Sequence, residues 1–132
     1  MRLFTYGTLR KGRSNHREFS GMLNFVETAV TREDQFIMYG TSYPYVLHKR
    51  QVAYEIRESM IPSQITGDVF EITDENAFAQ IAYMEIQAGY TLISVHLEGT
   101  AEALMWVSRD WDVVVSPKSV VPSGDWNQKL MW

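Results

Sequence analysis

The sequence contains no cysteine, and this absence excludes several classes of chemistry at once. Without thiols the chain has no disulfide, no thiolate metal site and no cysteine nucleophile. Histidine is also scarce: His16, His48 and His96 lie far apart and form no His-Glu-x-x-His or comparable metal-binding motif. Nothing in the sequence requires a metal ion, and we predict no cofactor.

Long apolar segments and an excess of positive charge are missing as well. No apolar run approaches the roughly 20 residues that a membrane-spanning helix needs. The net charge of −4 argues against bulk binding of nucleic acid. The first six residues are too short and too strand-like for a signal peptide. We therefore predict a cytoplasmic protein with neither nucleic-acid nor membrane partners.

The length and composition are typical of one soluble globular domain, and we predict a single domain over residues 1–132. The apolar pattern predicts many short strands and two short helices. The strands are expected over 2–6, 24–30, 35–39, 45–47, 65–72, 90–97 and 103–107, more weakly over 112–115, and the helices over 15–19 and 73–85. Residues 50–64 show the least pattern and suggest a long, mobile excursion. This order favours an α+β fold, a small and largely antiparallel barrel or rolled sheet with short helices.

One of the predicted helices places a carboxylate on an apolar face. Ala77, Phe78, Ile81 and Glu85 follow helical spacing, with Thr73 or Asp74 as the N-cap. Burial raises the pKa of a carboxyl group, and the negative end of the helix dipole acts in the same direction. Glu85 is therefore a candidate general base near neutral pH. The spacing alone slightly favours the alternative, in which Glu85 has already turned into water.

A loop bracketed by glycines follows the first predicted strand. Backbone amides between Gly7 and Gly12 can converge on an anion, and Thr8 can add a hydroxyl donor. The basic residues of Arg10-Lys11-Gly12-Arg13 would attract an acidic ligand. Taken alone, the pattern is that of an ordinary turn beside a solvated basic surface. It matches neither a Walker-type loop nor a Gly-x-Gly-x-x-Gly fingerprint.

Four blocks spread along the whole chain form a combination that points to a family. They are Leu3-Phe4-Thr5-Tyr6-Gly7-Thr8-Leu9-Arg10-Lys11-Gly12 followed by Asn15-His16, Tyr43-Pro44, Gly67-Asp68-Val69-Phe70-Glu71-Ile72, and Ser123-Gly124-Asp125-Trp126. The third block is followed by a helix that ends in Glu85 and by an aromatic residue, Tyr90, that opens the next strand. The combination resembles the γ-glutamylcyclotransferase-like superfamily, most closely its branch of AIG2-like and γ-glutamylaminecyclotransferase proteins.

The resemblance implies a small mixed-strand β-barrel with short helices and an intramolecular reaction. In that reaction the α-amine of a γ-glutamyl group attacks its own γ-carbonyl, which releases 5-oxoproline and the former amide partner. Glu85 would act first as general base and then as proton donor. The residues expected to bind the substrate are Tyr6, Gly7, Thr8, Leu9 and Tyr90. The implied partner is a small molecule with a γ-glutamyl group, and the reaction is independent of cofactors.

The match to the family pattern is incomplete around Glu85. Ala82 and Ile86 replace the usual Asp and Gly of the helix, and Thr91 and Leu92 stand where an Arg is common. Two interpretations therefore remain, a cyclotransferase and a non-catalytic binding module that keeps the pocket. A third hypothesis is an interaction protein that uses the apolar C-terminal residues 130–132.

Three aromatic residues also have purely structural interpretations. Tyr6 is equally compatible with a core position in which its hydroxyl is satisfied internally. Tyr90 fits packing better than chemistry, and Trp126 fits a cover over one end of the barrel. The segment 122–132 is expected to dock through its aromatic residues rather than to form regular structure.

Overall fold

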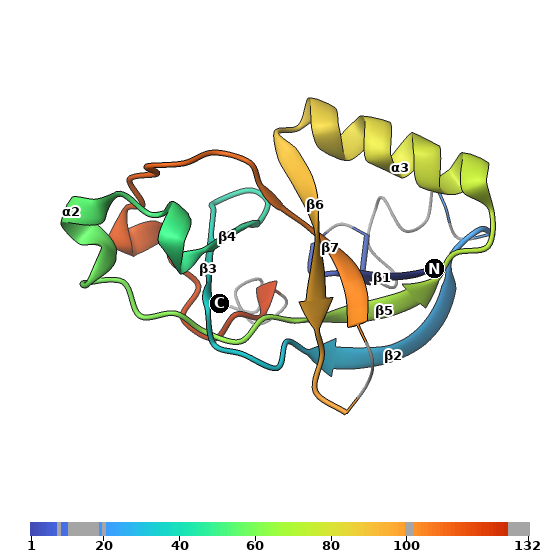
Figure 1. Ribbon diagram of the computed structural model, residues 1–132, viewed down its shortest axis with the longest axis horizontal. Coiled ribbons are helices and arrows are strands. Elements are labelled where there is room, and N and C mark those ends of the chain that lie inside the picture. Colours follow the sequence, from blue (N-terminus) through green and yellow to red (C-terminus); the bar gives the residue numbers. More distant parts are fainter. Residues whose placement is uncertain (8, 11–18, 20, 100–101, 127–132) are drawn as a thin grey trace.

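A mixed five-stranded sheet forms the centre of the computed structural model, which describes residues 1–7, 9–10, 19, 21–99 and 102–126 (Figure 1). The sheet has the order β2-β5-β1-β7-β6, in which β1 runs parallel to β7 and the other neighbours are antiparallel. Its strands are β1 (Arg2–Thr5), β2 (Asn24–Val30), β5 (Thr66–Glu71), β6 (Tyr90–His96) and β7 (Glu102–Ser108). A separate hairpin is formed by β3 (Phe36–Tyr39) and β4 (Tyr45–His48).

The predicted α+β class and mixed-strand architecture are confirmed, although the sheet does not close into a true barrel. The edge strands β2 and β6 meet where they end, through a bridge between Thr31 and Leu97. Backbone bonds from Arg32 N to His96 O (2.8 Å) and from Glu98 N to Val30 O (2.9 Å) support this bridge. Because the contact joins the ends of the two strands, the sheet is curved but remains open.

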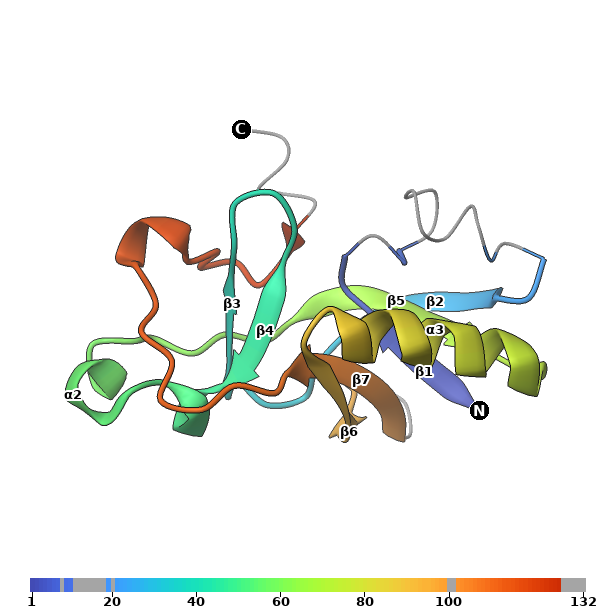
Figure 2. The ribbon, with the colours of Figure 1, turned by 90° about the horizontal axis from the view of Figure 1, so that it is seen from above.

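The helix α3 (Glu75–Gln87) runs along one face of the large sheet (Figures 1 and 2). Asp74 is its N-cap, and its carboxylate accepts hydrogen bonds from the amides of Asn76 and Ala77. Ala77 and Ile81 are fully buried against the sheet, as their spacing predicts. The helix extends two residues beyond the predicted end and stops before Gly89, whose φ of +96° suits glycine.

Other helical segments are short. In the described part of the chain they include α2 (Tyr54–Arg57) and the 3-10 turns η1 (Lys49–Gln51) and η2 (Pro117–Ser119). No helix in the described part of the chain has the length and apolar character needed to cross a membrane.

Two segments differ from the sequence-based expectation. Residues 50–64, expected to form a mobile excursion, contain α2 and bury Val52 and Met60 in a core cluster beneath the β3-β4 hairpin. Residues 112–115 form no strand, and Val113 makes a single bridge to Val52. Tertiary packing of isolated apolar residues orders both segments without any periodic pattern. The helix expected over 15–19 lies outside the described residues except for Phe19, which is buried.

A buried ion-pair cluster ties the loop after β1 to the rest of the molecule. Arg10 Nη2 lies 3.3 Å from Asp68 Oδ1, and Arg10 Nη1 lies 3.0 Å from Asp125 Oδ1. The side chains of Arg10 and Asp68 are only 7% and 6% exposed, and Thr28 donates a further hydrogen bond to Asp68. The guanidinium of Arg10 is therefore engaged within the protein, which corrects the expectation that it attracts an acidic ligand. Lys11 and Arg13 lie outside the described residues.

Each aspartate of this cluster follows a glycine that the backbone packing requires. A Cβ on Gly67 would lie 2.2 Å from the carbonyl oxygen of Thr5. A Cβ on Gly124, whose φ is +68°, would lie 1.9 Å from the carbonyl oxygen of Gln64. The Gly-Asp pairs of the third and fourth sequence blocks thus bring two carboxylates to Arg10 through close backbone contacts.

We predict that Asp68→Ala lowers the free energy of unfolding by about 3–5 kcal/mol, because it leaves a buried guanidinium without one of its partners. Urea denaturation measures the effect. Glu71→Ala is the matched control, since Glu71 pairs with the N-terminus and Arg2 at the exposed end of the same strand. That variant should lower the free energy of unfolding far less, because exposed ion pairs contribute little to stability. Equal losses in the two variants would contradict a structural role for the buried cluster.

Candidate active site

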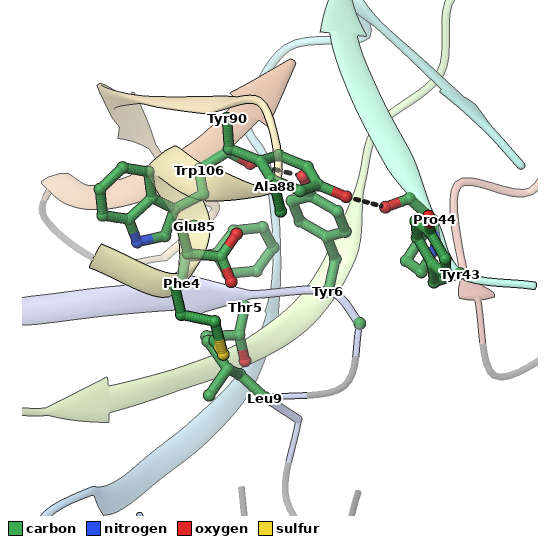
Figure 3. A pocket seen from close by; sticks show the side chains of 12 residues that line it. Phe4, Thr5, Tyr6, Leu9, Tyr43, Pro44, Glu85, Ala88, Tyr90 and Trp106 are labelled. Atoms are coloured by element: carbon green, nitrogen blue, oxygen red, sulfur yellow. Dashed lines mark hydrogen bonds between the residues drawn. The ribbon is translucent and has the colours of Figure 1, made fainter. Parts of the chain in front are cut away.

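A pocket of about 290 Å³ opens beside the C-terminal end of α3 (Figure 3). Its walls come from the end of β1 and the loop that follows, the turn before β4, the end of α3, and strands β6 and β7. The lining residues are Phe4, Thr5, Tyr6, Gly7, Leu9, Tyr43, Pro44, Met84, Glu85, Ala88, Tyr90 and Trp106. Segments far apart in the sequence therefore meet at one cavity.

The pocket brings together the described residues that the sequence singled out. These residues are Tyr6, Gly7, Leu9, Glu85 and Tyr90. Thr8, the remaining predicted substrate residue, lies outside the described part of the chain. Trp126 packs into the main core and does not line the pocket.

Sequence reasoning missed several lining residues, including Trp106, Met84 and Phe4. Trp106 lies on β7, and the pairing of β7 with β6 and β1 brings it to the pocket. No local pattern marks such a residue. The Tyr43-Pro44 pair resembles a turn of the family pattern. This resemblance predicted the turn but not its position at the pocket.

Glu85 lies one helical turn after the fully buried Ile81, at the point where α3 reaches the pocket. Its side chain is half-buried, so the alternative in which it turns fully into water is wrong. Burial raises the pKa of the Glu85 carboxyl from 4.5 to about 7, because removal from water disfavours the charged form. A carboxyl group with this pKa exchanges protons readily near neutral pH.

The two tyrosines of the pocket hold its walls in place. The hydroxyl of Tyr6 donates to the carbonyl oxygen of Trp106, and the hydroxyl of Tyr90 donates to the carbonyl oxygen of Pro44 at 2.8 Å. Burial, reinforced by nearby charges that include Glu85, raises the pKa of both hydroxyls further above their usual value. Both hydroxyls are therefore protonated near neutral pH. The hydroxyl of Tyr6 is thus hydrogen-bonded inside the protein, and the same residue also lines the pocket.

The loop after β1 is pressed against the turn before β4. A Cβ on Gly7 would lie 2.9 Å from Pro44 Cγ, so glycine allows the close approach. A backbone hydrogen bond from Arg10 N to Gly7 O, 3.0 Å long, closes the turn. The ion pairs of Arg10 then fix the far end of this loop to β5 and to the segment that carries Asp125.

Apolar packing occupies two of the four positions at which the sequence departs from the family pattern, and the other two, Ile86 and Thr91, are exposed. Ala82 and Leu92 are partly buried and pack in the cluster between α3 and the sheet. Arg109, which directly follows β7, contacts the last turn of α3, where its Nη1 donates to Ile86 O at 3.3 Å. Within the described ranges, no three His, Asp or Glu side chains gather into a group that could hold a metal ion.

Comparison with known proteins assigns the family. Residues 3–128 match the family described as "Gamma-glutamyl cyclotransferase, AIG2-like", and the chain belongs to that family. A Methanocaldococcus jannaschii protein named "Putative gamma-glutamylcyclotransferase" is 29% identical over 108 residues, which cover 80% of each chain. The predicted family resemblance is thereby confirmed, and membership supports a cyclotransferase-type function.

Two solved structures share the fold. An uncharacterized protein from Pyrococcus horikoshii matches with a TM-score of 0.72 and 24% identity, over 99% of this chain and 93% of that one. An AIG2-like protein from Mus musculus matches with a TM-score of 0.60 and 17% identity, over 94% of this chain and 86% of that one.

We predict that Glu85→Gln stabilises the protein at alkaline pH. The folded-state pKa of about 7 exceeds the ordinary 4.5, so the native state holds the proton more tightly, and stability falls as the pH rises from about 4.5 through 7. Glutamine carries no such penalty. The free energy of unfolding of Glu85→Gln, relative to that of the wild type, should increase by roughly 2 kcal/mol between pH 5 and pH 8, after allowance for partial exposure. Urea denaturation of both proteins measures it, and a difference independent of pH would contradict the burial of this carboxylate.

Proposed function

We propose that the protein is a γ-glutamyl cyclotransferase that releases 5-oxoproline from a small γ-glutamyl amine or peptide. The observation that carries the proposal is the half-buried carboxylate of Glu85, whose pKa is about 7, in a pocket beside the loop after β1. Family membership supports the reaction type and a small γ-glutamyl substrate.

In the proposed reaction the α-ammonium group of the substrate must lose a proton before its nitrogen can attack. The Glu85 carboxylate accepts this proton, and the amine nitrogen then forms a bond to the γ-carbonyl carbon. Collapse of the tetrahedral intermediate breaks the bond between that carbon and the nitrogen of the amine partner. The ring nitrogen gives up a second proton, and both protons end on the released amine, which leaves as an ammonium ion at neutral pH.

The loop at residues 6–9 is proposed to hold the γ-glutamyl group through its backbone amides. Held at both ends, the substrate brings its amine and its γ-carbonyl together, so that ring closure requires little further ordering. The anchored turn at Gly7 and Arg10 supports this role, because donors fixed by the fold need not reorganise during the reaction.

A non-catalytic binding module is the second candidate. The observation that favours it is the replacement of polar family residues by Ala82, Thr91 and Leu92, two of which only pack in the apolar cluster. Such a protein would keep the pocket and the affinity for a γ-glutamyl compound without turnover.

An assay of 5-oxoproline by mass spectrometry tests the proposal. The purified protein is incubated with a panel of γ-glutamyl amines, γ-glutamyl dipeptides and glutathione. We expect product from the wild type and a loss of at least about 100-fold in Glu85→Gln. The control is Glu75→Gln, an exposed position in the first turn of the same helix, which should retain activity. A γ-glutamyl compound that raises the melting temperature without any turnover would instead identify the binding module.

The pH profile of the same assay should follow the ionisation of Glu85. The base must be ionised, so kcat/KM is expected to fall about tenfold per pH unit below an apparent pKa near 7. An acid limb near pH 4.5 would show that the essential base is not a buried carboxylate.

A further inference from the structure

Four tyrosines form a continuous cluster of ring contacts, and two of them, Tyr90 and Tyr43, line the pocket. Tyr90 stacks on Tyr45 with ring centroids 5.3 Å apart, and Tyr45 stacks on Tyr39 at 5.5 Å. Tyr43 leans against Tyr45 at 5.4 Å. We name these four residues the tyrosine wall.

Tyr43 is the member of the wall that a bound molecule can reach from solvent. It lines the pocket while 52% of it stays exposed, whereas Tyr90 is buried. The tilted contact with Tyr45, whose ring stacks on Tyr39 and on Tyr90, supports its ring in position. Tyr43 therefore presents a fixed aromatic surface at the pocket mouth.

The arrangement of the pocket decides which part of a substrate meets Tyr43. In Figure 3 Glu85 lies at one end of the pocket, Tyr43 and Pro44 lie at the other, and Tyr6 and Tyr90 lie between them. Under the proposed function, the γ-glutamyl group reacts beside Glu85 and the loop. The amine partner on the other side of the scissile bond then extends toward the mouth.

The charges of the pocket decide the character of that partner. Of the described lining residues, Glu85 alone carries a side chain that is formally charged, and Tyr43 and Pro44 lie at the end of the pocket away from it (Figure 3). A partner with a carboxylate would find no cationic side chain among these described lining residues to compensate its charge. A second ammonium group would find no acidic lining residue other than Glu85, which the α-amine already engages. A flat apolar group instead gains contact with the aromatic face.

We infer that Tyr43 is a specificity-determining residue that binds the amine partner of the γ-glutamyl substrate, and that this partner carries an aromatic ring and no charged group besides the amine that is released. The inference rests on the proposed function, and it deepens that function by naming the class of leaving group. The rigid tyrosine wall makes the contact favourable, because its surface is already ordered before binding.

The test compares kcat/KM for γ-glutamyl-benzylamide and γ-glutamyl-methylamide, with γ-glutamylglycine as the anionic alternative. The wild type should prefer the benzylamide over the methylamide by about tenfold, and γ-glutamylglycine should be the poorest of the three. Tyr43→Ala should reduce the benzylamide preference to within about twofold. Tyr43→Phe, which keeps the ring, should retain most of it.

Tyr83→Ala is the matched control, since Tyr83 is an exposed tyrosine of α3 that does not line the pocket. Its preference ratio should equal that of the wild type. Turnover with an unchanged ratio in Tyr43→Ala, or a preference for γ-glutamylglycine, would overturn the inference while the proposed function stands. Absence of 5-oxoproline from every substrate would reject the proposed function and the inference together.

Discussion

The site depends on one carboxylate that is held partly out of water. Glu85 continues the apolar face of α3, so the packing that fixes Ala77 and Ile81 against the sheet also fixes the position of the acid. Burial alone raises its pKa to about 7. The fold thus gives a common side chain an uncommon proton affinity, and the cost of burying it is offset by the rest of the core.

The opposite wall of the pocket depends on a second electrostatic constraint. Arg10 is buried between Asp68 and Asp125, which come from β5 and from the segment that packs Trp126 into the core. Gly67 and Gly124 permit the backbone contacts that bring these aspartates close. The loop with Gly7 is therefore anchored to two distant parts of the chain. A basic residue that suggested ligand attraction serves instead to position the loop.

Local patterns predicted the elements that local forces determine. The apolar spacing and the acidic cap predicted α3, and alternating residues predicted β6 to within one residue of its end. The strand expected over 24–30 matches the bounds of β2. The sequence contains no local pattern that marks residues placed at the pocket by tertiary structure. Trp106 reaches the pocket through β7, and Tyr43 reaches it through the turn before β4. The sequence also could not predict that the sheet stays open rather than closing into a barrel, because closure depends on how far β2 and β6 diverge. Family resemblance, rather than spacing, favoured Glu85 as a site residue.

A direct titration of Glu85 tests the central claim. Carbon-13 NMR of the glutamate side-chain carboxyl groups, with Glu85→Gln to assign the signal, follows the ionisation of this one residue across the pH range. The account predicts a midpoint near pH 7, set by burial in the pocket wall. A midpoint near 4.5, the ordinary value for a glutamate, would show a fully solvated carboxylate and contradict its role as a base tuned by the fold.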